Sequence, residues 1–307
     1  MESILVSVVV IAYNSEKTIL ETLNSINKQT YKNIEIIICD DSSQDNTIKI
    51  CTEWKTKQKI KNVMILESIN NEGIAKNINK GLKKVNGKWI KLIAADDILV
   101  NDCIEKNLNF INENKDVNIC FSKIEKFYST SNQIIGFLPR KNNFFKLTSE
   151  EQYKQLQKEC FVPAPSSFIK KEIFQKYGYF DERIPMIEDW PYWLKITLAG
   201  EKLYYFDEVT VKYRIGDTLS NNMTRLINYN FLNSKFLIYK YYLRNEVGFF
   251  LKYHYLFEYT SQMYLAKFFN NKRNKFSLIT FKYIKIFDFC FIYLRLKEFL
   301  KKEKDEQ

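Results

Sequence analysis

The sequence predicts an α/β fold, a mainly parallel sheet with helices on both faces, followed by a helical C-terminal region. Two observations support this prediction. Strand-like and helix-like segments alternate four times in about the first 115 residues, the pattern of a parallel sheet with crossover helices. From about residue 225 the composition changes to Tyr, Phe, Leu, Ile, Lys and Asn with helical spacing. We therefore expect two domains, residues 1–222 and 223–307.

The predicted strands are apolar runs, and the first, residues 4–12, is rich in Val and Ile, as a strand buried on both faces should be. Between the strands, apolar residues recur with the spacing of an amphipathic helix, as at Ile19, Leu23 and Ile26. The later strands are predicted at 34–39, 63–66 and 89–95, and the helices at 19–26, 48–60, 74–85 and 104–111.

After residue 122 the regular alternation ends, and residues 123–160 mix short strand-like segments with polar loops. Prolines predict a rigid loop at 161–167. Glu188-Asp189 is expected to open a helix, because acidic residues favour the first helical turn. Further strands are predicted at 203–206 and 209–213, and a strand running into a short helix at 168–177.

The composition is that of an ordinary globular protein, with 46% hydrophobic and 27% charged residues. The chain has one histidine, His254, which argues against a histidine-based metal site or a Ser-His-Asp triad. Its six cysteines lack Cys-x-x-Cys spacing and are best explained as free thiols in a reducing compartment. No apolar stretch reaches ~18 residues and no basic region precedes residue 4, so we expect a cytoplasmic chain without a transmembrane helix or signal peptide.

Positive charge is concentrated at the C-terminal end of the chain. The formal net charge is +11, and from Arg225 onward there are 16 Lys and Arg against 7 Asp and Glu, a net of +9. This asymmetry predicts an anionic partner. A basic, aromatic-rich helix can lie on a membrane surface, and the alternative is a helical appendage packed on the first domain with solvated lysines. We expect no nucleic acid, since no binding motif accompanies the charge.

Asp96 and Asp97 directly follow the apolar run of residues 89–95. Ligands of open α/β sheets bind beyond the carboxyl ends of the strands. Magnesium sites commonly use one or two carboxylates together with substrate phosphates. The pair therefore suggests a phosphate-bearing substrate held through a metal, and the alternative is a helix N-cap.

Two other groups follow predicted strands or open a helix. Tyr13 and Asp41 come after the first two strands. An aromatic ring there can stack on a nucleobase, and a carboxylate can accept a hydrogen bond from a base N–H. The alternative for Asp41 is a turn. Asp189, with Glu188 before it, is a candidate general base toward a hydroxyl. The alternative for this pair is an acidic helix N-terminus.

Taken in order, these segments resemble the family 2 glycosyltransferases of the GT-A fold, over about residues 4–220. The motifs that carry the resemblance are Val6–Glu16, Ile36–Thr47, Asn71-Glu72-Gly73, Asn79-Lys80-Gly81, Ile93–Asp97, Phe180-Asp181-Glu182, Glu188-Asp189, Ala199-Gly200 and Tyr213-Arg214.

The resemblance implies an inverting, nucleotide-sugar-dependent glycosyltransferase, with a UDP-linked donor expected. Tyr13 would stack on the base, Asp41 would hydrogen-bond it, and Asp96 would contact the ribose side. Asp97, with Asp96, would bind Mn²⁺ or Mg²⁺. Asp189 would be the general base, and Glu188 would help to hold the acceptor. The remaining nucleotide-binding positions implied are Ala12, Asn14, Glu16, Asn71 and Gly73.

The implied acceptor is a saccharide or lipid-linked hydroxyl in cell-surface polysaccharide synthesis, reached from the inner face of the membrane. Three positions depart from the family pattern: Ala94 replaces an acidic residue, Ile78 an arginine and Gly216 a histidine. With so few carboxylates, metal binding is expected to depend strongly on bound nucleotide. The departures also motivate an alternative, a catalytically inert nucleotide-sugar-binding or scaffold protein. A third hypothesis is a basic nucleic-acid-binding protein with an α/β core.

Overall fold

A computed structural model describes residues 3–58, 62–129, 131, 133–139, 142–216, 225–284 and 287–288. The chain divides into two compact units. The first comprises Met1–Glu182 and Glu188–Gly216, and the second Arg183–Ile187 and Asp217–Gln307. The domain boundary predicted at residue 222 lies outside the described residues.

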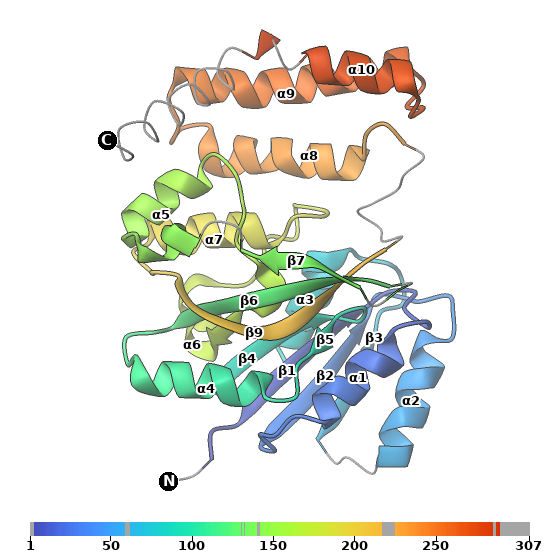
Figure 1. Ribbon diagram of the computed structural model, residues 1–307, viewed down its shortest axis with the longest axis vertical. Helices are drawn as coiled ribbons and strands as arrows, with labels where there is room; N and C mark the ends of the chain where they lie inside the picture. The colour runs from blue at the N-terminus through green and yellow to red at the C-terminus, as the bar shows by residue number, and fades with distance from the viewer. Residues whose placement is uncertain are drawn as a thin grey trace. The chain divides into compact units, whose positions relative to one another are not determined.

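Four parallel strands form the first half of the sheet, in the order β3-β2-β1-β4 (Figure 1). The apolar runs of the sequence form these strands, as predicted, because Val and Ile fit a sheet that is buried on both faces. Val8, Val9 and Val10 of the central strand are fully buried. The bounds are β1 (Val6–Ala12), β2 (Ile34–Asp40), β3 (Val63–Glu67) and β4 (Trp89–Ala94).

Helices cover both faces of these strands, as the alternation of strand and helix predicts. Alternate residues such as Val8 and Val10 join one core cluster with the apolar stripes of α1, α2 and α4. Val9 points to the other face, toward Gly81 of α3, where an added Cβ would lie 2.8 Å from Val9 and 2.4 Å from the sulfur of Cys39. Only glycine lets α3 lie so close to the sheet. The bounds are α1 (Ile19–Asn27), α2 (Thr47–Gln58), α3 (Ile74–Leu82) and α4 (Cys103–Glu113).

The second half of the sheet is mixed, since β8 runs antiparallel to its neighbours β4 and β6, whereas β9 runs parallel to β6. Here one prediction is wrong: the two strands expected at 203–206 and 209–213 are a single strand, β9. Between Ser122 and Lys123 the register shifts, which leaves Asp207 and Glu208 of β9 in a bulge. These two acidic residues suggested a loop in the sequence, but in the structure they interrupt the pairing of β9 with β6 only locally. The bounds are β5 (Ile98–Leu99), β6 (Ile119–Tyr128), β7 (Ile134–Leu138), β8 (Phe168–Lys170) and β9 (Tyr204–Ile215).

The less regular middle of the chain contributes short helices to the first unit. Thr148 and Glu151 form a capping box that begins α5, each bonding to the other's backbone N–H. Phe168 to Tyr177 is a strand that runs into a short helix, as predicted. The elements are the 3₁₀ turns η1 (Asn142–Lys146) and η2 (Ala164–Ser166) and the helices α5 (Ser149–Leu156), α6 (Lys171–Tyr177) and α7 (Asp189–Leu198).

The second unit is helical, as the composition change predicts. It contains α8 (Tyr229–Ile238), the π-helical turn η3 (Tyr239–Leu243), α9 (Phe249–Phe268) and α10 (Lys275–Ile284). A small core of Ile227, Leu232 and Ala266 joins these helices. No helix among the described residues is both long enough and apolar enough to cross a membrane.

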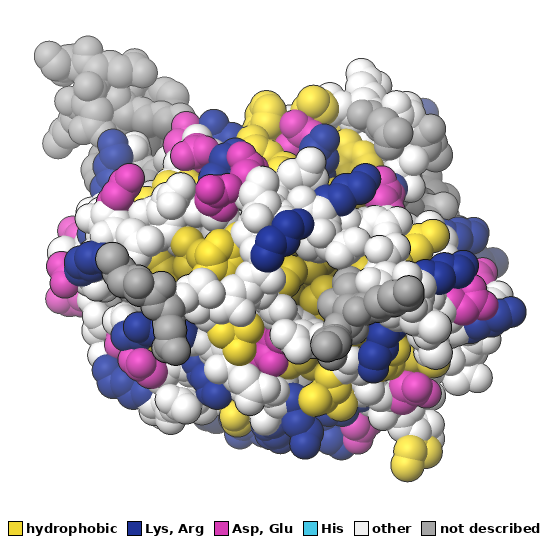
Figure 2. All heavy atoms as spheres, turned by 90° about the horizontal axis from the view of Figure 1, so that it is seen from below, with side chains coloured by type: hydrophobic (Ala, Val, Ile, Leu, Met, Phe, Trp, Pro, Cys, Tyr) yellow, Lys and Arg dark blue, Asp and Glu magenta, His cyan; other side chains and the backbone are white. Residues whose placement is uncertain are grey.

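Charged side chains of both signs are interspersed on the face of the molecule shown in Figure 2. Lysine and arginine side chains alternate there with acidic ones, and small hydrophobic areas lie between them. On this face the excess of positive charge is therefore not gathered into one patch.

Candidate active site

Three adjacent parallel strands place the predicted donor-side residues at one edge of the sheet. In the sheet register Ala12 of β1 lies opposite Asp40 of β2, and Ile11 lies opposite Ala94 of β4. Tyr13, Asp41 and the pair Asp96-Asp97 follow these strand ends directly. The topology thus brings together side chains that are far apart in the sequence, at the edge where α/β sheets bind ligands.

Asp41 fixes the loop that precedes α3. Its side chain is buried, and its two carboxylate oxygens accept from the backbone N–H groups of Glu72 at 2.8 Å and Gly73 at 2.9 Å. Gly73 has a φ of 90°, which favours glycine. The structure therefore brings together Asp41, Asn71 and Gly73, and Asp41 keeps spare acceptor capacity because each carboxylate oxygen has a further lone pair.

The loops after β1 and β2 are joined by reciprocal hydrogen bonds. The N–H of Asn14 donates to Ser43 Oγ, and Asn14 Oδ1 accepts from the N–H of Gln44, both at 2.8 Å. Glu16 Oε2 accepts from the N–H and side chain of Asn46 at 3.1 and 2.9 Å. Asn14 and Glu16 thus shape the loop that carries the partly exposed Tyr13.

Asp96 and Asp97 differ in burial. Asp97 is 1% exposed, whereas Asp96 is partly exposed. Asp97 Oδ1 accepts from the backbone N–H of Arg214 at 3.1 Å, and Asp97 Oδ2 has no hydrogen-bond partner among the described residues. Burial, and then the charge of Asp96, raise the pKa of Asp97 well above its usual range.

Arg214 of β9 supports this pair, although the sequence assigned it no role beyond its place in a motif. Its Nε donates to the backbone oxygen of Asp96 at 2.8 Å, and its guanidinium pairs with Glu21 of α1. The guanidinium also lies over the ring of Phe127, 4.8 Å from the centroid. Its place in the Tyr213-Arg214 motif was the sequence signal that could have revealed it.

Replacing Arg214 with alanine is expected to lower the free energy of unfolding by about 3 kcal/mol, since the partly buried backbone oxygen of Asp96 loses its donor and the packing of the guanidinium on Phe127 is lost, while the N–H that bonds Asp97 is kept. The matched control is Glu21→Gln. The Glu21 side chain is 57% exposed, so its loss is expected to cost less than about 1 kcal/mol. Urea unfolding of both variants measures the two values, and equal costs would mean that the surface ion pair, not the contact with Asp96, stabilises this region.

Asp96 and Asp97 offer some, but not all, of the ligands that a divalent cation needs. A buried carboxylate oxygen without a partner, Asp97 Oδ2, beside a second carboxylate, Asp96, offers the hard oxygen ligands that Mg²⁺ and Mn²⁺ prefer. No group of three or more His, Cys, Asp or Glu side chains that could hold a metal lies within the described part of the chain. The remaining ligands of a cation here would have to come from a phosphate-bearing substrate and water.

Glu188 and Asp189 lie at the N-terminus of α7, as predicted. Asp189 Oδ1 accepts from the N–H of Trp190 at 2.8 Å. Aromatic packing anchors the helix, because the indole of Trp190 donates to the carbonyl of Leu156 at 2.8 Å and the Trp193 ring meets that of Phe121 edge to face. The two carboxylates therefore sit on a rigid element.

The two carboxylates hold their protons to a higher pH than usual. Burial, and then the charge of Asp189, raise the pKa of Glu188 to about 8, and burial also raises the pKa of Asp189. Loss of hydration on burial is the main physical cause for both groups, because it disfavours the charged form. Groups that titrate near neutral pH are suited to proton transfer.

Among the described residues, no hydrogen bond or ion pair joins Glu188-Asp189 to Asp96-Asp97. Two interactions lie at the ends of the loop 161–167. Just before the loop, burial and then the charge of Asp189 raise the pKa of Cys160 well above its usual range. At its end the fully buried Lys91 of β4 donates from Nζ to the carbonyls of Pro165 at 2.5 Å and Ser167 at 3.3 Å. Lys91 was not predicted as a site residue, because the run 89–95 that contains it was interpreted only as a strand.

Comparison with known proteins adds three findings. A family model described as Glycosyl transferase family 2 matches residues 7–178. A curated relative from Escherichia coli, the UDP-Glc:alpha-D-GlcNAc-diphosphoundecaprenol beta-1,3-glucosyltransferase WfaP, is 31% identical over 229 residues, which cover 73% of this chain and 83% of WfaP.

The third finding is a likeness to solved structures, which concerns the fold. S. aureus TarS 1–349 in complex with UDP-GlcNAc matches with a TM-score of 0.60 and 21% identity, covering 84% of this chain and 72% of that one. The match spans 43% of a longer TarS chain. The mannosyltransferase PcManGT from Pyrobaculum calidifontis, in complex with GDP-Man and Mn²⁺, matches with a TM-score of 0.54 and 14% identity, covering 92% of this chain and 69% of that one.

Proposed function

The chain belongs to glycosyl transferase family 2 and has the GT-A fold, and from this premise we propose that it is a metal-dependent inverting glycosyltransferase with a UDP-linked donor. The observation that carries the proposal is the unpartnered oxygen of Asp97 beside Asp96, at the edge of the sheet where Asp41 and its loop also lie. The proposed acceptor is a hydroxyl of a saccharide or lipid-linked saccharide in cell-surface polysaccharide synthesis.

On the donor side, the proposed roles follow from the positions of the side chains. Tyr13 would stack on the base from the loop that Asn14 and Glu16 shape. Asp41 would accept from a base N–H with the lone pairs left over from its two backbone hydrogen bonds. Asp96, which is partly exposed, would face the ribose side of the nucleotide.

Asp97 and Asp96 are the residues that would hold Mn²⁺ or Mg²⁺. When bound, such a cation stabilises the negative charge of a departing nucleoside diphosphate. Arg214 would keep the pair in position through its backbone N–H and its Nε. The shortage of protein ligands is the reason to expect metal binding to depend on the nucleotide.

On the acceptor side, Asp189 is proposed to remove the proton of the attacking hydroxyl. The hydroxyl oxygen then forms a bond to the anomeric carbon while the bond from that carbon to the diphosphate oxygen breaks, and the proton stays on Asp189. Attack opposite the leaving group inverts the configuration. The raised pKa of Asp189 suits this step, because a stronger base accepts the hydroxyl proton more readily.

The names of similar proteins support the donor and acceptor classes. WfaP is named for transfer from UDP-Glc to a diphosphoundecaprenol-linked sugar, and a TarS structure contains UDP-GlcNAc. The proposed location follows from such an acceptor, the cytoplasmic face of the cell membrane with peripheral contact. The PcManGT structure contains GDP-Man, so the base of the donor needs a direct test.

The test is a screen of UDP- and GDP-linked sugars that follows release of the nucleoside diphosphate with Mn²⁺, Mg²⁺ or a chelator. We expect release from a UDP-sugar that a chelator abolishes. Release from GDP-sugars alone would overturn the proposed base, and UDP binding without turnover across a broad panel of donors and acceptors would favour the inert scaffold.

Calorimetry with Mn²⁺ tests the metal arrangement separately. Because the protein supplies few ligands, UDP is expected to tighten Mn²⁺ binding on the order of 10- to 100-fold. By reciprocity, Mn²⁺ should tighten UDP binding by the same factor. Equal Mn²⁺ affinity with and without UDP would show that the cation does not bridge the protein and the diphosphate.

A further inference from the structure

The second unit exposes an unusual number of large hydrophobic side chains. Of the 22 such side chains that are exposed among the described residues, 14 lie between Tyr229 and Phe287. On α9, Tyr264 is 75% exposed and Phe268 is 77% exposed, and on α10 Phe276 and Tyr283 are each more than half exposed. Scattered exposed hydrophobics are normal, but a concentration of this kind marks an interaction surface.

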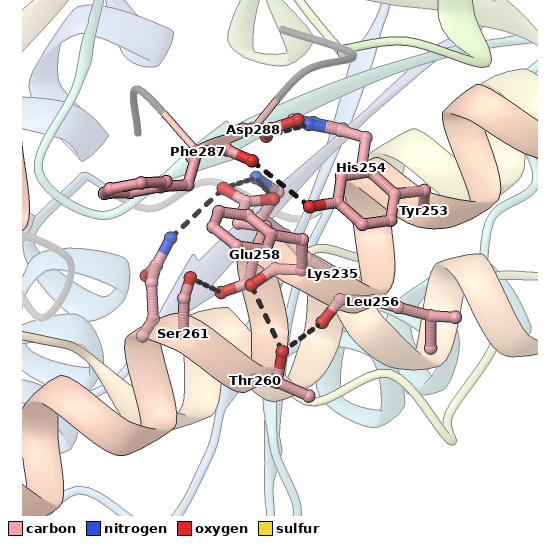
Figure 3. Close-up of polar contacts among 11 residues, drawn as sticks. Lys235, Tyr253, His254, Leu256, Glu258, Thr260, Ser261, Phe287 and Asp288 are labelled. Atoms are coloured by element: carbon pink, nitrogen blue, oxygen red, sulfur yellow. Dashed lines mark hydrogen bonds and ion pairs between the residues drawn. The ribbon is translucent and has the colours of Figure 1, made fainter. Parts of the chain in front are cut away.

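α9 carries large hydrophobic side chains on its exposed side as well as on its buried side. It buries Tyr255, Leu265 and Ala266. Polar groups beside these residues pair with neighbours, as Figure 3 shows: Glu258 pairs with Lys235 of α8 at 2.5 Å, and His254 pairs with Asp288 at 2.6 Å. Its exposed side carries Leu256, Tyr264 and Phe268. A surface helix in contact with water normally has mainly polar residues on that side.

The charges around this face are almost all positive. Residues 249–284 contain six lysines and arginines and one acidic residue, Glu258, which Lys235 pairs. Exposed Lys267, Lys275 and Lys282 flank the aromatic side chains on α9 and α10. Aromatic side chains with lysines and no free carboxylate match the interface of an anionic bilayer, where rings sit at the headgroup level and cations meet lipid phosphates.

We propose that the exposed side of α9 and α10 docks on an anionic membrane surface. The occupant is a bilayer and not a second copy of the chain, since a two-fold interface would bring this lysine-rich surface against itself, and lysine is depleted from interface cores. It is not a nucleic acid either, because phosphate contacts do not require exposed Phe and Leu side chains. The inference identifies a surface outside the proposed active site and is independent of the proposed chemistry.

The test is flotation of the full chain with vesicles of phosphatidylcholine alone or mixed equally with phosphatidylglycerol. We expect binding to the mixed vesicles that weakens with salt. Because each lysine near such a surface contributes about 1 kcal/mol, Lys267→Gln with Lys275→Gln should lower the partition coefficient roughly 30-fold. Tyr264→Ser with Phe268→Ser should lower it at least as far. The matched control is Ile134→Ser with Leu198→Ser, two exposed hydrophobics of the first unit, which should bind as the unchanged chain does.

Three results would overturn the inference: no flotation of the unchanged chain, flotation of the Tyr264/Phe268 variant equal to that of the unchanged chain, or a concentration-dependent dimer that this variant dissociates. Release of UDP from a UDP-sugar on transfer of the sugar to a water-soluble acceptor, measured on the same variants, separates the two proposals. Flotation that the Tyr264/Phe268 variant loses while it retains release supports the docking surface. The same pattern of flotation with no release from any of the proteins, the unchanged chain included, also supports the surface and contradicts the enzymatic proposal alone.

Discussion

Asp97→Asn is expected to lower kcat/KM for sugar transfer by about a thousandfold while leaving the fold at least as stable. The proposed loss follows from the cation, whose charge stabilisation is worth several kcal/mol, and about 4 kcal/mol corresponds to a thousandfold in rate. Asparagine keeps an oxygen for the N–H of Arg214 but removes the anionic ligand. Steady-state kinetics with saturating Mn²⁺ measures the loss.

The stability side of this prediction has its own physical reason. Burial and the charge of Asp96 raise the pKa of Asp97, so its charged form destabilises the fold once the pH exceeds the pKa of an unfolded aspartate. Removing that charge should therefore leave the melting temperature unchanged or raise it at pH 8. The control is Asp102→Asn, whose carboxylate is exposed and paired with Lys106, and which should retain full activity. A large fall in melting temperature for Asp97→Asn would assign Asp97 a structural role instead.

Asp189→Asn is expected to lower kcat by about a hundred- to ten-thousandfold, the range for loss of a general base. The amide oxygen can still accept from the N–H of Trp190, so α7 should begin as before. Affinity for UDP should not change, because Asp189 is proposed to act on the acceptor. Kinetics paired with calorimetry separates the two effects, and an equal loss of UDP affinity would contradict the proposed division between donor and acceptor residues.

The pH profile gives a second, independent measurement. A base must be deprotonated to act, and burial raises the pKa of Asp189, so the rate of the unchanged enzyme should begin to fall at a higher pH than an ordinary aspartate would give as the pH is lowered. Because burial and not the charge of Glu188 raises this pKa, Glu188→Gln should leave the limb in place with a much smaller loss of kcat than Asp189→Asn. A limb that moves to lower pH in Glu188→Gln would mean that the charge of Glu188 also raises the pKa of the base.

The sequence located the strand ends that carry the proposed donor-side residues. Each lies within one residue of its predicted position, because a buried apolar run followed by Tyr13, Asp41 or Asp96 is a local pattern. The two-strand reading of residues 203–213 failed because Asp207 and Glu208 look like a loop when read locally, whereas a bulge in a long strand accommodates them.

Arg214 and Lys91 show what the sequence left out. The contact between Arg214 and Asp97 joins residues 117 apart in the chain, and Lys91 reaches carbonyls more than 70 residues away. No local pattern specifies such partners, since they are set by the order of strands in the sheet and by the packing of loops on it. The exposed side of α9 is a similar case, because the helix is apolar on several sides and only its packing shows which side remains exposed.

The sequence by itself thus determined the α/β alternation, the acidic residues at the strand ends and the basic, aromatic character of the C-terminal helices, since hydrophobic period and residue type are properties of short segments. Tertiary structure alone decided which oxygen of Asp97 is left without a partner, that Arg214 is the residue that bonds to Asp96 and Asp97, and which side of α9 is exposed. Burial and hydrogen-bond partners depend on every element that packs against a residue, and those elements come from distant parts of the chain.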